Sequence, residues 1–166
     1  LILLVHGLGR TPVAMFGLAA HLRRAGHRTR FFGYSPTLEP FPHIVRRLTT
    51  LLRNLARRNQ PVGLVGHSLG GLLLRLAVAD VPELRVRRLV TLGTPNPPAL
   101  SAVRASRLFP FRWLTRGCGR FLASADAVPH PAVPTLRIAG TAGPVGRWGH
   151  FGTEPNDAVV SVAETR

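Results

Sequence analysis

The sequence of 166 residues predicts one domain, residues 1–166, with an α/β fold: a doubly wound, mostly parallel sheet flanked by helices. Strand-like and helix-like segments alternate along the chain, with one unit roughly every 30 residues. The strand-like segments are mostly continuous apolar runs, which is typical of strands buried on both faces of a parallel sheet. In such folds the functional side chains gather at the carboxyl edge of the sheet.

The first elements are a strand, a helix and a second strand. Residues 1–5 form a short apolar strand. Thr11 and Pro12 supply an N-cap and a first-turn proline for a helix that ends at Gly26. Residues 28–34 form the next strand.

The following segments complete the predicted sheet. Residues 40–58 form an amphipathic helix whose apolar face covers the sheet, with Ile44, Val45, Leu48, Leu51, Leu52 and Leu55 on that face. Residues 61–65 form a third strand and residues 72–79 a helix. Two further strands are predicted over residues 86–92 and 134–140.

The turn after the third strand is the most informative feature. It reads Gly-His-Ser-Leu-Gly, and the order strand, Gly-x-Ser-x-Gly turn, helix is that of a nucleophile elbow. Such a turn strains the serine backbone and presents the hydroxyl at the strand tip, and side chains at Gly66 and Gly70 would collide with neighbouring elements. We therefore predict that Ser68 is a nucleophile. His67 occupies the variable position and is predicted to be a structural histidine that points away from the serine.

The chain resembles the α/β-hydrolases, and among them the small bacterial lipases and esterases. Besides the elbow, residues 3–9 are similar to the first strand and oxyanion loop of these enzymes. Residues 91–96 are similar to their strand and loop after the elbow helix, and residues 156–160 to the block that holds their catalytic acid. The likeness departs at Ala158, where glycine is usual, and stops before the family's histidine. Since the chain also opens without a methionine and its first residue already lies in a strand pattern, we expect a chain truncated at both ends.

The resemblance also implies a lid or an acyl-binding wall inserted at about residues 96–133, where prolines and aromatic residues interrupt the pattern. An irregular helical connection packed on the sheet is the alternative, because Phe and Trp are as often core residues as pocket residues. Cys118 lies in this stretch and is interpreted as structural. A single cysteine excludes an internal disulfide.

Serine hydrolysis needs hydrogen-bond donors for the oxyanion, an acid and a base. The peptide N–H of Leu69 opens the elbow helix beside the reacting carbonyl, and the resemblance implies that the N–H of Leu8 is the second donor. Each such donor stabilises the transition state by on the order of 3 kcal/mol. His6 is predicted to brace this loop by hydrogen bonding rather than to transfer protons.

Asp157 is the predicted acid, because Asp80 and Asp126 fall outside the loop after the last strand, where the fold supplies its acid. An aspartate that caps its own turn is the alternative interpretation of this residue. Glu154 is the second candidate for the acid.

The base is expected after the acid in the chain, and no histidine follows Asp157. We favour a base on a strand and helix beyond Arg166. His150 is the substitute candidate, which would need an unusual order of the triad, and His130 is another upstream histidine. Residues 1–166 alone are then expected to be nearly inactive, whereas a chain extended through the next histidine cleaves p-nitrophenyl esters. Equal turnover by both would point to His150.

The net charge of +15 comes from 22 arginines and no lysine, against 7 acidic residues. A charge of this size would suggest nucleic acid or an anionic membrane as partner. The arginines are scattered over helix-like segments, and no aromatic stacking motif accompanies them, which argues against nucleic acid. Peripheral contact with an anionic lipid surface, screened by salt, is kept as a hypothesis. No apolar run approaches the roughly 18 residues of a membrane span.

We therefore predict a serine hydrolase of carboxylic esters, of the lipase or esterase type, that forms an acyl-enzyme on Ser68 without a metal or an organic cofactor. The same machinery serves acyltransferases and thioesterases. A binding protein that keeps the fold without its base is the alternative from another class. The single cysteine fits the cytoplasm, and a signal peptide that precedes Leu1 would lead to export instead.

Overall fold

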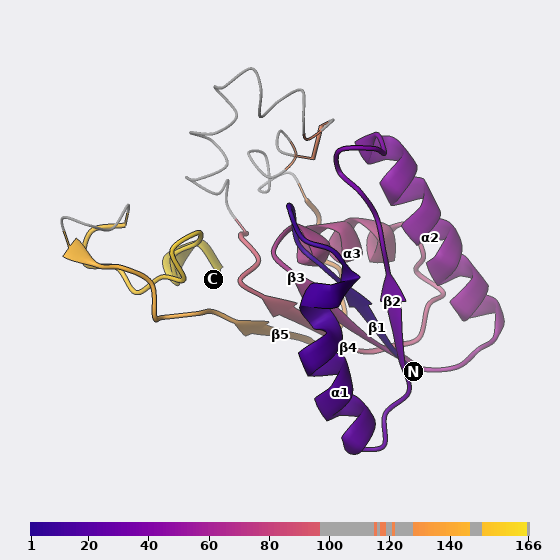
Figure 1. The fold of residues 1–166 in the computed structure, drawn as a ribbon. Coiled ribbons are helices and arrows are strands. Elements are labelled where there is room, and N and C mark those ends of the chain that lie inside the picture. The colour runs from indigo at the N-terminus through magenta and orange to yellow at the C-terminus, as the bar shows by residue number, and fades with distance from the viewer. Residues whose placement is uncertain (97–114, 116, 119–120, 122–127, 147–150, 166) are drawn as a thin grey trace.

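The structure is a computed structural model that describes residues 1–96, 115, 117–118, 121, 128–146 and 151–165. Within these residues, five parallel strands form one sheet, and they are β1 (Ile2–Val5), β2 (Thr29–Phe32), β3 (Val62–His67), β4 (Val86–Leu92) and β5 (Thr135–Ile138). Their order across the sheet is β2-β1-β3-β4-β5, which puts the elbow strand β3 at the centre (Figure 1). The predicted parallel α/β sheet is confirmed.

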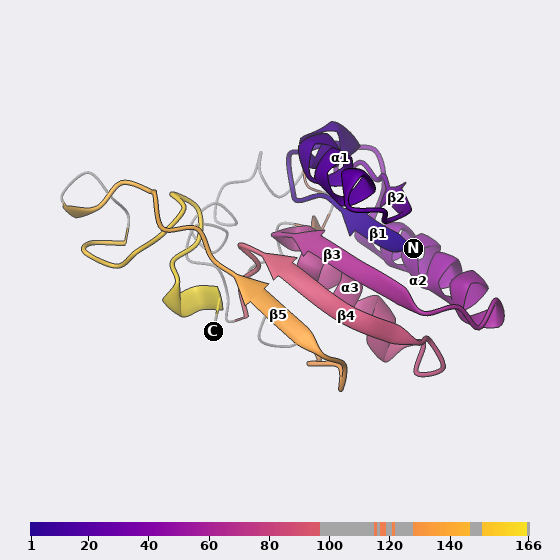
Figure 2. The same cartoon turned by 90° about the horizontal axis from the view of Figure 1, so that it is seen from below.

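Helices cover both faces of this sheet. The helix α1 (Phe16–Arg24) lies on one face, and α2 (Phe41–Arg57) and α3 (Leu69–Ala79) lie on the other (Figure 2). Each of the first three parallel connections passes through one of these helices. The sheet is therefore doubly wound, as the sequence predicts.

Two apolar cores follow from the alternation of side chains along the strands. Leu3 and Val5 of β1 point to the face of α2 and α3, whereas Leu4 between them points to the face of α1. Leu64 and Val65 of β3 divide in the same way. Burial on both sides explains why these strands are continuous apolar runs.

The predicted helix after β1 begins differently from the sequence expectation. A 3₁₀ turn, η1 (Pro12–Met15), precedes α1, and the Thr11 side chain makes no capping hydrogen bond. The Pro12 ring packs on Gly33, where an added Cβ would lie 3.1 Å from Cγ of the proline. The turn is therefore held by the packing of Pro12 on Gly33 and not by a side-chain cap.

The strand predicted over residues 28–34 is shorter, because Tyr34 leaves it to bind His6. The Tyr34 N–H donates to Nε2 of His6 (3.4 Å), and its hydroxyl donates to the His6 carbonyl (2.9 Å). The bounds of α2 and β4 agree with the prediction to within one residue.

In the described residues after β5, a loop is held together by Asn156, whose side chain is fully buried, and it leads into the 3₁₀ turn η4 (Ala163–Thr165). Its Oδ1 accepts the N–H of Ala158 (2.8 Å), and its Nδ2 donates to the carbonyls of Glu154 (2.9 Å) and Pro144 (3.2 Å). The insertion predicted at residues 96–133 falls mostly outside the described residues. No helix in the described part of the chain is long and apolar enough to cross a membrane.

Candidate active site

Ser68 forms the tight turn between β3 and α3 in a strained backbone conformation. Its φ is 49° and its ψ is −120°, and a side-chain-bearing residue held there costs of order 1–3 kcal/mol. Three hydrogen bonds hold the turn. The Ser68 N–H donates to the Leu92 carbonyl (2.8 Å), and the Ser68 carbonyl accepts the N–H of Gly71 (2.9 Å) and the hydroxyl of Thr94 (3.1 Å). The strain is thus supported by the end of β4 and the residues just after it.

The glycines around Ser68 allow α3 to pack closely against the sheet. A Cβ on Gly66 would lie 2.5 Å from main-chain atoms of Gly71, and a Cβ on Gly70 would overlap the Val5 carbonyl oxygen. A Cβ on Gly71 would overlap the Thr94 side chain. Side chains at these positions would push the helix away from β1 and β3, in agreement with the collisions expected at Gly66 and Gly70.

The two segments predicted to hold the oxyanion donors lie beside Ser68. Leu69 is the first residue of α3, so its N–H is among the four at the helix start that lack an intrahelical acceptor. The N-terminal end of a helix also favours negative charge. The loop with Leu8 borders the serine from the other side, because a Cβ on Gly7 would lie 3.1 Å from Cβ of Ser68.

The buried side chain of His6 braces the loop after β1. The side chain is 1% exposed and stacks on Tyr34, with ring centroids 4.3 Å apart and an interplanar angle of 7°. Its Nδ1 lies 2.9 Å from the Gly7 carbonyl, while Nε2 accepts the Tyr34 N–H. One nitrogen donates and the other accepts, which suits the neutral ring. Burial correspondingly lowers the pKa of His6.

His67 packs against the same loop. A Cβ on Gly7 would lie 2.7 Å from Nδ1 of His67, so the ring lies directly against the glycine. Burial lowers the pKa of His67, the positive charge of Arg10 lowers it further, and the negative charge of Asp157 opposes the shift. These surroundings suit the predicted structural role.

The Asp157 carboxylate has two different environments. Its Oδ1 accepts the N–H groups of Val159 (2.9 Å) and Val160 (2.7 Å), which is the self-capping turn considered as the alternative interpretation. Its Oδ2 faces the carboxyl end of β4, because a Cβ on Gly93 would lie 2.8 Å from that oxygen. One carboxylate thus fixes its own turn with one oxygen and directs the other toward the sheet edge that holds the elbow.

The other candidate acids and bases lie elsewhere or outside the described residues. Asp80 is the C-cap of α3, at the opposite end of that helix from Ser68. Glu154 is exposed and contributes its main-chain carbonyl to the loop. His130 precedes β5 and therefore lies toward the opposite edge of the sheet from the elbow. Asp126 and His150 fall outside the described residues, and in the described part of the chain no group of three or more His, Cys, Asp or Glu could hold a metal ion.

A family model described as the alpha/beta hydrolase fold matches residues 1–145. This chain belongs to the α/β-hydrolase family. No curated protein matches it. Among solved structures, it is similar to the Bacillus licheniformis lipase BlEst2 in its mature form, at 23% identity and a TM-score of 0.71 over 99% of this chain and 78% of that one.

The phospholipase PlaB from Legionella pneumophila is similar at 15% identity, with a TM-score of 0.72 over the whole of this chain and 45% of that one. A monoacylglycerol lipase from Paleococcus ferrophilus is 20% identical, with a TM-score of 0.50 over 66% of this chain and 47% of that one. The chain therefore spans less than half of these two proteins. At such identities the likeness establishes the shared fold.

In this α/β-hydrolase, Thr94 borders Ser68 and Gly93 borders Asp157, and the sequence predicted a role for neither Thr94 nor Gly93. Both lie directly after β4, in the segment that resembles the family. A glycine and a hydroxyl residue at the carboxyl end of a strand next to the elbow strand are the signal that could have found them.

Proposed function

We propose that this protein is a serine hydrolase of carboxylic esters, of the lipase or esterase type, with Ser68 as the nucleophile. The strained serine between a central strand and a helix N-terminus carries the proposal. The Ser68 hydroxyl attacks the ester carbonyl, and the N–H groups of Leu69 and Leu8 stabilise the oxyanion. The alcohol then leaves, and water cleaves the acyl-enzyme to release the acid and restore the serine.

Asp157 is proposed to orient the base through Oδ2, the oxygen that its own turn leaves unused. The base takes the Ser68 proton and gives it to the leaving alcohol. Two positions are proposed for this histidine, His150 or a residue beyond Arg166. His150→Gln in a chain extended beyond Arg166 tells the two apart. Loss of turnover in this variant points to His150, and retained turnover points to the later histidine.

We base the proposed substrate class on the names of the similar proteins. Their names identify a lipase, a phospholipase and a monoacylglycerol lipase, so we propose an ester with an acyl chain. Acyl transfer and thioester cleavage use the same site, and product analysis with added alcohol or thiol separates them.

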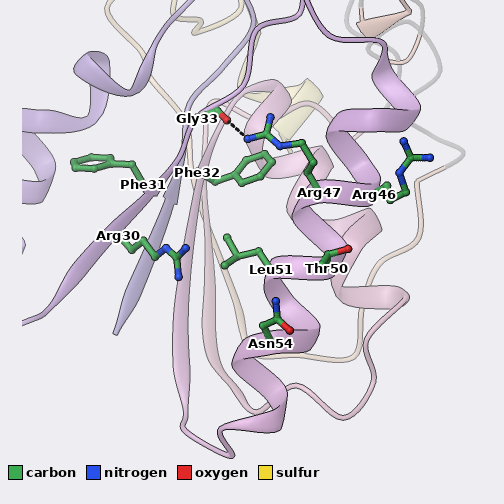
Figure 3. A pocket seen from close by; sticks show the side chains of 9 residues that line it. All are labelled: Arg30, Phe31, Phe32, Gly33, Arg46, Arg47, Thr50, Leu51 and Asn54. Carbon is green, nitrogen blue, oxygen red and sulfur yellow. Dashed lines mark hydrogen bonds between the residues drawn. The ribbon is translucent and has the colours of Figure 1, made fainter.

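An arginine-lined groove is the proposed contact with anionic lipid. It has a volume of about 480 Å³ between β2 and α2, with Arg30, Arg46 and Arg47 around the apolar side chains of Phe32 and Leu51 (Figure 3). Arg47 is already held by Glu39, by the Gly33 carbonyl (3.3 Å) and by the Phe32 ring, with 5.3 Å between its guanidinium carbon and the ring centroid. No such contact involves Arg30 or Arg46 among the described residues, and these two side chains are the ones proposed to meet lipid phosphates.

Vesicle binding tests this groove. We expect the protein to sediment with phosphatidylserine vesicles at low salt and to be released as salt rises. The double variant R30Q/R46Q should bind more weakly, whereas R87Q/R88Q, which removes the same charge from exposed positions of β4, should not. Binding that is insensitive to salt, or equal loss in both variants, would contradict the proposal.

Turnover of short and long p-nitrophenyl esters by the full-length protein tests the catalytic proposal. We expect Ser68→Ala to abolish turnover, while Ser35→Ala, which changes a serine in the loop after β2, retains it. Turnover that persists in the Ser68 variant would exclude this serine as the nucleophile. Absence of any acyl turnover in the full-length protein would favour the alternative of a binding protein.

A further inference from the structure

A buried arginine marks a second site in the fold, away from Ser68. Arg75 is the one charged residue of α3 and is only 3% exposed. Burying a guanidinium costs free energy unless its donors and its charge are compensated. Arg75 donates to the carbonyls of Val128 (2.5 Å) and Pro129 (3.2 Å) and to Oδ1 of Asn96 (2.8 Å). These three acceptors are neutral, and they take up only part of the five N–H donors of the guanidinium.

Two more basic side chains approach Arg75. The Nη2 atom of Arg75 lies 3.1 Å from Nε2 of His130, and Nη2 of Arg137 lies 3.5 Å from Nδ1 of the same ring. A neutral imidazole accepts at one ring nitrogen only, so one of these contacts sets a ring N–H against a guanidinium. The cluster therefore has more donors than acceptors. Burial and the charges of both arginines lower the pKa of His130 accordingly.

The three basic side chains surround a small cavity of about 60 Å³. It is bounded by α3, β4, β5 and the loops beside them, and its polar lining consists of Arg75, Thr91, Asn96, His130, Thr135 and Arg137. A cavity needs roughly 10–15 Å³ to hold a single water molecule. A cavity of about 60 Å³ therefore holds an ion of a few atoms but not a larger organic ligand. Every charged or chargeable group that the described part of the chain contributes to the lining is basic, so the cavity favours negative charge.

We propose that this cavity binds a small monovalent anion such as chloride. The ion is held between the guanidinium groups of Arg75 and Arg137, and it links α3 to the edge strand β5. It also supplies the negative charge that the neutral partners of Arg75 do not. The folded chain binds the ion and the unfolded chain does not, so the ion stabilises the fold.

Thermal unfolding in sodium chloride and in sodium gluconate, at equal ionic strength, tests the proposal. Gluconate is too large for the cavity. We expect the melting temperature to rise with chloride and to level off, with no such rise in gluconate. Equal melting temperatures in the two salts at all concentrations would overturn the proposal.

Variants locate the effect. Arg137 is exposed, so Arg137→Gln should fold, and the loss of one charged hydrogen bond should weaken the apparent chloride affinity by about ten-fold. Arg88→Gln makes the same charge change at an exposed position of β4 outside the cavity and should retain the affinity. Equal weakening by both variants would indicate general screening instead. In bromide-soaked crystals, an anomalous peak between Arg75 and Arg137 supports the site, and peaks only elsewhere contradict it.

Discussion

Oδ2 of Asp157 faces Gly93 so closely that a Cβ on the glycine would lie 2.8 Å from that oxygen. Gly93 has a φ of +53°, and its N–H donates to the Ile138 carbonyl (2.8 Å). The residue before it, Leu92, accepts the N–H of Ser68. The proposed acid and the proposed nucleophile are therefore positioned by consecutive residues at the end of β4.

Gly93→Ala should lower ester turnover strongly. The added methyl group would displace the Asp157 carboxylate, and misplacement of a catalytic group by about 1 Å costs up to about 10²-fold in rate. The left-handed backbone adds a loss of stability of roughly 1–2 kcal/mol. Steady-state kinetics and thermal unfolding of the full-length protein measure both effects. Gly17→Ala, at an exposed position of α1 with no atom near the added Cβ, is the control: it should keep normal turnover and gain up to about 1 kcal/mol of stability, because alanine favours a helix over glycine. Normal turnover in the Gly93 variant would separate Asp157 from catalysis.

Ala158→Gly should stabilise the protein. Ala158 has a φ of 76°, a conformation that costs an L-residue roughly 1–2 kcal/mol, and the greater freedom of glycine in the unfolded chain offsets about half of the gain. We expect an increase of up to about 1 kcal/mol in the free energy of unfolding, measured with urea. Ala20→Gly, inside α1, should instead destabilise by about 1 kcal/mol. Destabilisation in both variants would contradict the assigned backbone strain.

The free energy of unfolding should fall as the solution becomes acidic. Burial lowers the pKa of His6 and of His67 from the ordinary value of 6.5. The unfolded chain thus binds more protons than the folded chain below pH 6.5. The contribution of the two buried neutral rings to the free energy of unfolding is therefore present above pH 6.5 and is lost as the pH drops below it. Urea unfolding between about pH 8 and about pH 5 measures the slope.

His6→Gln should lower stability, through loss of the Tyr34 stack, and should flatten part of that slope. His27→Gln changes an exposed histidine and should leave the slope intact. A protein that gains stability as the pH falls from about 7 to about 5 would refute the assignment of buried neutral rings.

Thr94→Val should weaken the support of the elbow. The Thr94 hydroxyl donates to the Ser68 carbonyl, and valine fills the same space without the donor. We expect a loss of about 1 kcal/mol in stability and a lower kcat with little change in KM, because the serine conformation is less well held. Thr94→Ser keeps the hydroxyl and should restore kcat. An equally low kcat in the serine variant would attribute the effect to packing of the lost methyl group.

The sequence predicted the sheet well because both its faces are buried. Burial on two sides produces the continuous apolar runs that mark β1, β3 and β4, and α2 shows its apolar face through helical spacing. The boundary at Tyr34 was wrong, because that residue leaves the strand for a contact with His6, 28 positions away. Such a long-range hydrogen bond has no local pattern.

The candidate site divides in the same way. The elbow at Ser68 is a local motif, with a local steric reason for its glycines. The contact of Asp157 with Gly93 joins residues far apart in the sequence and has no local pattern, so the sequence and the family resemblance pointed to Asp157 alone. The sequence placed Arg75 in an apolar helix without predicting a role for it, although a single charge inside such a helix indicates a buried polar cluster.

Covalent labelling of the full-length protein with a fluorophosphonate, followed by mass spectrometry of its peptides, tests the central claim most directly. The oxygen of an activated serine bonds to the phosphorus, fluoride leaves the phosphorus, and the serine proton departs with it as hydrogen fluoride, whereas an ordinary serine reacts poorly. We predict one stoichiometric label on the peptide that contains Ser68, and none in Ser68→Ala. Label on a different serine, or no label in a protein that hydrolyses esters, would contradict the claim that Ser68 is the nucleophile.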